Sequence, residues 1–525
     1  MSTTTVRTTG GAGATAAADA PAGAAPLVVD KGLKPGTIGL LGSTVLGVVQ
    51  TAPAYSLAVT LGLLAATVGI QSPALVVLGF LPILCITIMQ RAFLRQDPDC
   101  GTLLVWVGRS LGPSLGWLTS WTAIVATLIA LANLALVTGS YAFLTVGADD
   151  LATSAVATTA VGLVWLAAVT ALALRGIEIS SRLQTVLLVA GMAVLGIFTA
   201  VALVKVAAGT AGDQAAAPAL DWLNPFGVDG SGALSAGLLL TIFLFWGWDG
   251  PSAVVEEADE AATPRKAIAL SVGLLLGFYL LSGIAVQAYA GVGAEGIGLG
   301  NEEHAGDVLG VVGSAAVGSW FGTLMEIAVL TSAAACLAAA IVPSARALLA
   351  MGAYRALPET FAKVDRRTGA PVSGTIAVAL GTGVVLVVLQ LVSQNVLADA
   401  IGALGLLIAL YYTVFGLGYL WAFRARILGG GARALLLEGL LPLAGTAVLG
   451  WAFVRTLKDT YATDYGATTI LGVGGVFAIG VVAVGLGVLG MVAWRLRAPA
   501  FFRGETFAPD YVREHRPDLV GALDA

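Results

Sequence analysis

Long apolar runs separated by short polar segments fill the chain from about residue 37 to residue 494. A helix needs about 20 apolar residues to cross the roughly 30 Å hydrocarbon core of a bilayer. By this measure the pattern predicts an all-α membrane protein, with the turn between its ninth and tenth spans at Asn395 to Asp399. The twelve predicted spans are 37–64, 73–94, 114–146, 153–174, 181–206, 232–255, 267–291, 312–346, 373–394, 396–422, 434–454 and 466–494.

The composition supports a protein embedded in the lipid bilayer. Of the 525 residues, 58% are hydrophobic and only 11% are charged, whereas soluble domains carry about 25% charged residues. A net charge of −5 gives no reason to expect nucleic acid as a partner. Three isolated cysteines and two histidines favour neither a disulfide framework nor a metal site, so we expect no metal and no cofactor.

Positive charges indicate the orientation in the membrane. All of the 26 Lys and Arg residues except Lys205, Arg455 and Lys458 fall in the two tails or in the loops after spans 2, 4, 6, 8 and 10. Lys and Arg accumulate in cytoplasmic loops, so the sequence predicts a multi-pass protein of the plasma membrane with both termini cytoplasmic. Residues 1–35 are expected to form a disordered N-terminal tail, and 495–525 a cytoplasmic C-terminal tail.

The sixth span contains a carboxylate beside a helix breaker, in "FLFWGWDGPSAVVEEADE", Phe243 to Glu260. A charge at bilayer depth costs at least about 2.5–3.5 kcal/mol, and Pro251 cannot donate a backbone hydrogen bond. Irregular backbone at this depth is tolerated where protein or a water-filled cavity satisfies it. We therefore expect a discontinuous helix whose free ends, with Asp249, line a polar site.

Two other interpretations of this segment remain open. Asp249 could lie near the cytoplasmic end of the span beside Glu256 and Glu257, where charge is less costly. Alternatively, Gly250 and Pro251 could form a simple kink.

The first span has a matching irregularity in "GVVQTAPAYSLAV", Gly47 to Val59, where Pro53 stands among polar residues. Five helices separate the starts of the two units, so the second would lie inverted relative to the first. Interrupted helices at corresponding places in two inverted halves indicate a transporter site. A half-helix N-terminus binds an anionic group and exposed carbonyls bind a cation. This geometry fits a zwitterion, which suggests an amino acid as the small-molecule substrate.

Several stretches resemble the amino acid–polyamine–organocation (APC) permease superfamily over roughly residues 33–425. They are "GLLGSTVLGVVQTAPAYSLA", "DPDCGTLLVWVGRSLGPSLGWLTSW", "RGIEISSRLQTVLLVAGMAVLGIF", "SARALLAMGAYRALPETFAKVDRRTGAPVSG" and the span-6 segment "FWGWDGPSAVVEEADEAATPRKA". The resemblance implies ten core helices in two inverted five-helix repeats, with discontinuous helices 1 and 6, followed by two additional helices. The repeats would be 36–206 and 232–422, and the additional helices 434–494.

The resemblance also implies the location of the substrate, between the unwound parts of helices 1 and 6. The family's glycine–serine–glycine turn aligns with Pro53-Ala54-Tyr55, which contains no glycine. Backbone amides near this turn would bind a carboxylate, carbonyls in both helices an amine, and aromatic side chains of helix 6 would pack on the substrate. The implied substrate residues are Val49, Gln50, Thr51, Ala54, Tyr55, Ser56, Phe243, Phe245, Trp246, Gly247, Trp248 and Asp249. Arg346 and Arg366 are expected to be cytoplasmic and structural.

A coupling proton or sodium ion is expected from the same resemblance. Some proton-linked members carry a lysine in helix 5, where this chain has Gly191. Sodium could bind between helix 1 carbonyls and the hydroxyls of Thr331 and Ser332, although such hydroxyls often bond within their own helix. Asp249 and Glu326 are the candidates for proton coupling.

We therefore predict a secondary transporter of amino acids that works by rocking one helix bundle against the other. A transporter of polyamines or other organic amines, with Asp249 paired directly to the cation, is the main alternative. A receptor or channel is a further one, and the sequence offers no polar catalytic cluster for an enzyme. The particular substrate, the coupling ion and the oligomeric state stay open.

Overall fold

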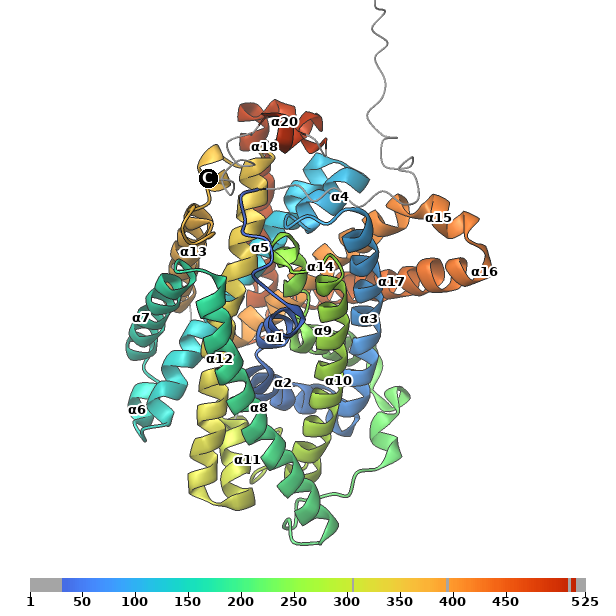
Figure 1. Cartoon of the computed structure of the whole chain (residues 1–525). Coiled ribbons are helices and arrows are strands. Elements are labelled where there is room, and N and C mark those ends of the chain that lie inside the picture. The colour runs from blue at the N-terminus through green and yellow to red at the C-terminus, as the bar shows by residue number, and fades with distance from the viewer. Residues whose placement is uncertain (1–30, 305, 393–395, 509–510, 516–525) are drawn as a thin grey trace, which may run out of the picture.

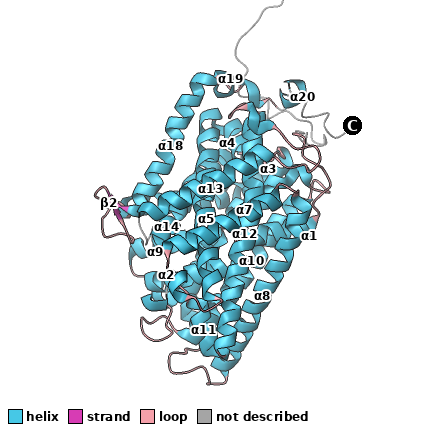
Figure 2. Ribbon diagram, turned by 90° about the vertical axis from the view of Figure 1, so that its left-hand side faces the viewer, coloured by secondary structure: helices cyan, strands magenta, loops and turns pink. Residues whose placement is uncertain are grey.

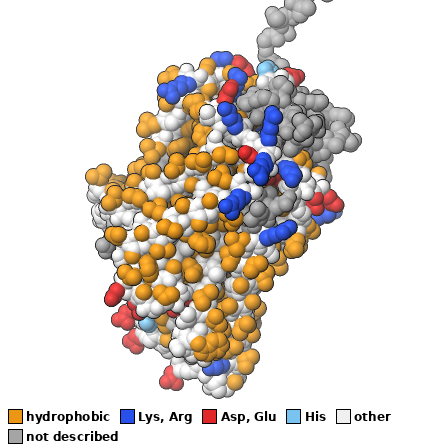
Figure 3. Space-filling model, turned by 60° about the vertical axis from the view of Figure 1, so that its left-hand side comes forward, with side chains coloured by type: hydrophobic (Ala, Val, Ile, Leu, Met, Phe, Trp, Pro, Cys, Tyr) orange, Lys and Arg blue, Asp and Glu red, His pale blue; other side chains and the backbone are white. Residues whose placement is uncertain are grey.

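The computed structural model describes residues 31–304, 306–392, 396–508 and 511–515, almost entirely as helices (Figures 1 and 2). Within this part of the chain, eleven helical segments are long and apolar enough to cross a membrane. The first of them, Leu40–Gln96, has 57 residues and covers two of the predicted spans. An apolar surface covers the middle of the molecule, and most Lys and Arg on the face in Figure 3 lie in its upper half.

The helices of the first half follow the predicted runs closely. They are α1 (Leu40–Val49), α2 (Pro53–Val68), α3 (Ser72–Gln96), α4 (Leu103–Leu111), α5 (Pro113–Leu144), α6 (Asp149–Ala152), α7 (Ala155–Ala173) and α8 (Ile177–Ala207).

The second half continues with α9 (Gly230–Phe245), the 3₁₀ helix η4 (Gly250–Glu257), α10 (Thr263–Ala290), α11 (Val308–Val317), α12 (Ser319–Ala353), α13 (Val372–Val392) and α14 (Val396–Ala422). The C-terminal part contains α15 (Arg424–Gly429), α16 (Gly431–Ala434), a π-helical turn (Leu435–Leu440), α17 (Leu441–Asp459), strands β1 (Thr469–Ile470) and β2 (Val473–Gly474), α18 (Gly475–Arg497), α19 (Pro499–Phe502) and α20 (Tyr511–His515).

Three predicted boundaries are wrong. The run 312–346 is divided at Gly318, whose φ of 125° ends α11 and lets it pack back on α12. The run 466–494 becomes helical only at Gly475, because its first residues form the antiparallel hairpin of β1 and β2. Asp399 lies in the first turn of α14 rather than in a turn between helices, while Asn395 lies outside the described residues.

The beginning of the described chain corrects the expected extent of the disordered tail. Residues 1–30 lie outside the described part, but Lys31 and Leu33 are buried. Thr37 and Ile38 then donate their N–H groups to the carbonyl of Glu257, the last residue of η4. The segment just before α1 is therefore part of the packed structure.

Two groups of helices pack among themselves and face each other. In one group α1 and α3 pack on α10, and α2 and α3 pack on α9. In the other, α5, α7, α12 and α13 all contact one another. Helices α8 and α14 contact members of both groups.

Both helices with irregular sequence are interrupted. α1 ends at Val49 and α2 begins at Pro53, with Ala52 in the left-handed conformation (φ 46°, ψ 66°) that costs a non-glycine residue roughly 1–2 kcal/mol. α9 ends at Phe245, and Gly247 adopts a φ of 110° before the chain re-enters η4. A Cβ on Gly247 would lie 2.5 Å from the carbonyl oxygen of Gln50, so the two interruptions are in contact.

We predict that Gly247→Ala lowers the stability of the protein by about 1–3 kcal/mol, because alanine is strained at this φ and its Cβ overlaps Gln50. Thermal unfolding in detergent measures the effect, with size-exclusion chromatography used to monitor the loss of folded protein. Gly273→Ala is the matched control, since Gly273 of α10 has open space where a Cβ would stand. Equal melting of the two variants would show that the contact between the interruptions contributes no stability.

Candidate functional site

The interruption of helix 1 exposes the N-terminus of α2. Pro53 occupies its first position, where the missing N–H has no intrahelical acceptor in any case. The N–H groups of Ala54 and Tyr55 belong to the same first turn and are likewise without an acceptor inside the helix. The amide of Ser56 was predicted to join them, but it donates to the carbonyl of Ala52. The turn therefore offers two amides to an anionic group rather than three.

Contacts from α12 and α10 hold the C-terminal end of α1, where backbone carbonyls are left without partners inside the helix. The thiol of Cys336 donates to the carbonyl oxygen of Gln50 at 3.1 Å, and Nε2 of Gln50 donates to the carbonyl oxygen of Ala339 at 3.4 Å. Tyr279 of α10 donates its hydroxyl to Oγ1 of Thr51 at 3.0 Å. A thiol is a weak donor, so the carbonyl of Gln50 remains a good acceptor for an amine.

A cavity of about 140 Å³ lies where the two interruptions meet. Eight of the twelve predicted substrate residues line it: Gln50, Thr51, Tyr55, Ser56, Phe243, Trp246, Gly247 and Asp249. The other four are buried in the surrounding core: Val49, Ala54, Phe245 and Trp248. A cavity of roughly 150 Å³ holds a benzene-sized molecule, so this one suits a small substrate.

Other helices complete the cavity with residues that the sequence did not single out. They include Gln90 of α3, Ser120 and Thr127 of α5, Cys336 and Ser344 of α12, and Tyr411 of α14. Gln90 carried a signal, because it is a polar residue within a predicted span. The Ser and Thr positions carried none, since such residues are common in membrane helices and bond to their own backbone.

Asp249 is the centre of a hydrogen-bond network at the interruption of the sixth span, between α9 and η4. Its Oδ2 accepts from Nε2 of Gln90 at 3.0 Å and from the hydroxyl of Tyr412 at 3.0 Å. Ser252 of η4 donates to Oε1 of Gln90 at 3.1 Å and fixes the orientation of that amide. The side chain of Asp249 is partly exposed to the cavity. It therefore lies at the break in the helix, and the simple-kink interpretation does not describe it.

An aromatic contact closes the network. The indole N–H of Trp246 donates to the hydroxyl of Tyr411, whose ring centroid is 4.5 Å from that of Tyr412. Trp246 and Tyr411 both line the cavity. The segment after α9 is thus bonded to α14 in the same wall of the cavity that contains Asp249.

The other coupling candidates lie away from this cavity. Neither Thr331 nor Ser332 is among the described residues that line it. The hydroxyl of Thr331 donates to the carbonyls of Ile327 and Ala328 in its own helix, and it stands beside Gly191 of α8. In the described part of the chain, the thiol of Cys336 is the α12 side chain that bonds to a carbonyl at the end of α1, that of Gln50.

Glu326 faces a second carboxyl group at the start of α11. Asp307 caps this helix by accepting the N–H of Gly310 at 3.2 Å. Burial, and then the neighbouring charge of Glu326, raise the pKa of Asp307 to about 7. Asp307 is therefore expected to titrate near neutral pH.

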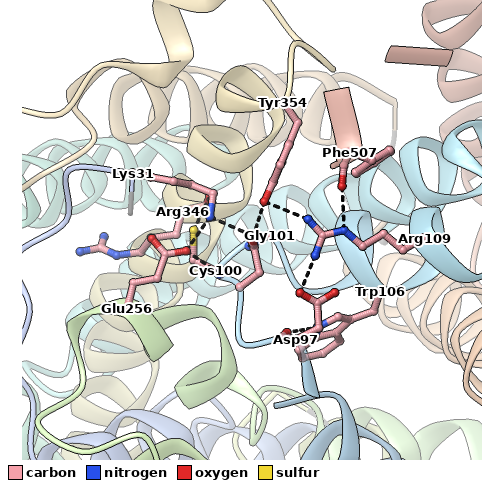
Figure 4. Close-up of polar contacts among 11 residues, drawn as sticks. Lys31, Asp97, Cys100, Gly101, Trp106, Arg109, Glu256, Arg346, Tyr354 and Phe507 are labelled. Carbon is pink, nitrogen blue, oxygen red and sulfur yellow. Dashed lines mark hydrogen bonds and ion pairs between the residues drawn. The ribbon is translucent and has the colours of Figure 1, made fainter. Parts of the chain in front are cut away.

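Figure 4 shows a buried charge cluster that includes Lys31, Cys100 and Glu256. Cys100 is close in sequence to Thr102 and Leu103, which line the cavity. The ammonium of Lys31 is 3.0 Å from Oδ2 of Asp99 and 2.6 Å from Oε1 of Glu256. The N–H of Cys100 donates to the same oxygen of Glu256 at 3.0 Å. The start of the described chain is thereby tied to the loop before α4 and to η4.

Two further ion pairs extend the cluster. Arg346 of α12 forms two hydrogen bonds with Glu257, of 2.7 and 2.8 Å. Arg109 of α4 pairs with Asp97 and donates to the carbonyl of Phe507 at 3.1 Å, which brings in the C-terminal segment. Arg346 thus has the structural role expected from the sequence, whereas Arg366 is exposed.

The charges of this cluster compensate one another. Burial disfavours the charged form of Lys31, but Asp99, Cys100 and Glu256 outweigh it and raise the pKa of Lys31 well above its ordinary value. Burial raises the pKa of Asp99, but Lys31 and Arg109 outweigh it and lower that pKa. Asp99, Cys100 and Glu256 lie close enough together to hold a metal ion. The ammonium of Lys31 supplies the cation at this place.

Comparison with known proteins gives a family match and one distant relative. A family model described as "Amino acid permease" matches residues 38–454. Cationic amino acid transporter 2, vacuolar, of Arabidopsis thaliana is 28% identical over 163 residues, which are 30% of this chain and 23% of that transporter. The match thus spans less than a quarter of the relative's length.

We predict that Lys31→Met destabilises the protein by about 3–5 kcal/mol, because it leaves the buried carboxylates of Asp99 and Glu256 without their cation. Unfolding in detergent measures the loss, and the thiol of Cys100 should react faster with alkylating reagents. Lys34→Met is the control, since Lys34 is exposed. Unfolding at the same temperature for both variants would contradict the role of Lys31.

Asp307 should make stability depend on pH. Its pKa is higher in the folded protein than the unfolded value of 3.8, so its contribution is full below that value and is lost as pH rises towards about 7. We expect the wild type to lose up to roughly 4 kcal/mol between pH 4 and 7 through this group. Asp307→Asn keeps an acceptor for Gly310 and should lose this dependence, while Asp150→Asn, at an exposed position, should retain it. A slope unchanged by Asp307→Asn would refute the assignment.

Proposed function

The chain belongs to the amino acid permease family, and on that premise we propose that it is a secondary active transporter that carries amino acids across the plasma membrane by alternating access. Membership of this family confirms the resemblance to the APC superfamily. It also makes the chain a multi-pass membrane transport protein rather than an enzyme.

One observation carries the proposal: two interrupted helices meet at a cavity and present opposite ends of half-helices to it. The N-terminus of α2, with the amides of Ala54 and Tyr55, would bind a carboxylate through its positive dipole end. The carbonyl end of α9, near Phe245 and Trp246, and that of α1, at Gln50, would bind an amine. A zwitterion bound in this way neutralises both helix ends at once.

We propose twelve spans arranged as two inverted five-helix repeats and two additional helices. The segment Leu40–Gln96 is too long for one crossing of about 20 residues and is interrupted by a 3₁₀ turn at Gly69–Gln71, so it counts as two spans. Interruptions in both the first and the sixth helix support the repeat. The charge cluster links Lys31, before the first span, to Phe507, after the last span. An even number of spans requires these two segments to lie on the same side of the membrane.

Alternating access would arise from movement of the two helix groups. The cavity lies between α1, α2 and α9 on one side and α5 and α12 on the other. On the side rich in Lys and Arg, proposed to be cytoplasmic, the charge cluster ties the two groups through Arg346 and Glu257. Opening on that side would separate these partners.

The coupling ion is proposed to be a proton carried by Asp249. Its position at the cavity wall supports this choice over the hydroxyls of Thr331 and Ser332, which do not line the cavity. Sodium at those hydroxyls remains the alternative. The relative named for cationic amino acids supports amino acids as cargo, while the carboxylate of Asp249 in the cavity also suits an organic amine or polyamine.

Counterflow in liposomes tests the proposal. The purified full chain is reconstituted, and exchange of a mixed labelled amino-acid pool is measured with and without sodium at two pH values. We expect saturable counterflow that does not need sodium. A channel would show no counterflow, and exchange of polyamines alone would assign the cargo to the amines.

We predict that Asp249→Asn reduces proton-driven uptake to background while the protein remains folded, because the variant cannot carry a proton. Asp229→Asn is the control, since Asp229 is an exposed residue before α9. Near wild-type uptake by Asp249→Asn at every pH would remove this carboxylate from the mechanism.

A further inference from the structure

The charge of the cavity is unusually simple. Among the described residues that line it, Asp249 is the one with a carboxyl group, and no Lys or Arg is present. The remaining lining groups are hydroxyls, amides, a thiol, aromatic rings and aliphatic side chains. Arg91, which follows Gln90 on α3, is not among them.

The titratable groups around Asp249 are phenols and a thiol, which leaves Asp249 as the carboxyl group of the cavity. Tyr411 and Tyr412 face it from α14, and Tyr55 of α2 and Cys336 of α12 line the same cavity. Phenols and thiols are ordinarily neutral at pH 7. On α3 the partner of Asp249 is the uncharged Gln90, whose amide oxygen accepts from Ser252 of η4.

The two neighbouring side chains that donate hydrogen bonds to Asp249 share one of its carboxylate oxygens. Gln90 and Tyr412 both donate to Oδ2. Neither donor carries a positive charge, so among the described residues the carboxylate has no cationic partner. A carboxylate at membrane depth is normally paired with such a partner.

A bound zwitterion does not supply this partner. Its carboxylate and amine neutralise the half-helix ends of α2 and α9, which leaves the negative charge of Asp249 uncompensated. From this arrangement, and resting on the proposed transport function, we infer that a proton and a positively charged substrate side chain are alternative partners of Asp249. Amino acids with neutral side chains enter with one proton, and amino acids with a cationic side chain enter without one.

The same reasoning excludes acidic side chains. The side-chain carboxylate of an acidic substrate would find no Lys or Arg among the described lining residues of the cavity. It would lie near Asp249, whose negative charge repels it. The loaded cavity carries no excess negative charge only with a neutral side chain plus a proton, or with a cationic side chain. The substrate class is therefore neutral and cationic amino acids.

Two substrate pairs with matched carbon skeletons test the inference. Lysine is norleucine with an ammonium group added on its terminal carbon, and glutamine and glutamate differ in an amide or carboxylate. Counterflow of each is measured in liposomes from pH 5 to pH 8. Above the titration of Asp249, the apparent KM of norleucine should rise about tenfold per pH unit, while that of lysine should not rise. Glutamine should exchange and glutamate should not.

The variant Asp249→Asn provides the second arm. Norleucine exchange should become independent of pH, and lysine exchange should fall by at least about tenfold because the cationic side chain has lost its partner. An equal pH dependence for norleucine and lysine in the wild type would overturn the inference even if the variant fails to fold. Exchange of glutamate at the rate of glutamine would overturn it as well.

Cys336 separates failure of this inference from failure of the proposed function. Its thiol lines the cavity, so a bound substrate should slow its alkylation, which is followed by mass spectrometry of the Cys336 peptide. If neither norleucine nor lysine exchanges or protects Cys336 at any pH, the proposed function fails and the inference fails with it. If both protect and exchange but respond alike to pH, the inference alone fails.

Discussion

The central constraint in this molecule is that backbone interrupted within an apolar bundle must still have its polar groups satisfied. Helices 1 and 6 meet this constraint together, because Gly247 leaves room for the carbonyl of Gln50 and Gly250 leaves room for its side chain. Cys336 and Tyr279 supply donors from the helices behind. The position of the cavity, and the elements that surround it, follow from this one contact.

The interruptions also determine the electrostatics of the cavity. Half-helix ends offer partial charges of both signs without ionised side chains, and a substrate with both signs matches them. Asp249 adds a full negative charge beside these partial ones, stabilised at one oxygen by Gln90 and Tyr412. The other described residues of the wall carry no carboxylate, Lys or Arg, so under the proposed function charge is the main property by which the site would distinguish ligands.

The charge cluster at one end of the bundle solves a different problem. Carboxylates and cations there come from five separate parts of the chain. Lys31, Asp99, Glu256, Glu257 and Arg346 are nearly inaccessible to solvent, whereas Arg109 and Asp97 are partly exposed. Breaking one buried partner leaves another uncompensated, which is far more costly than losing an exposed pair. Such a cluster specifies how the segment before α1, the loop before α4, η4 and α12 assemble.

Much of the fold and part of the site could be predicted from the sequence, because their signals are local. Runs of apolar residues of bilayer length gave the helices, and Pro53, Gly250 and Pro251 marked the interruptions. Apolar length could not show that Gly318 divides one run or that residues before Gly475 form a hairpin, since both segments are as apolar as a span. Tertiary structure alone decided the partners: Gln90 meets Asp249 across 159 residues, and Lys31 meets Glu256 across 225. A helical period records which residues share a face, but the choice of a partner depends on how distant helices pack, and no local pattern in the chain encodes that.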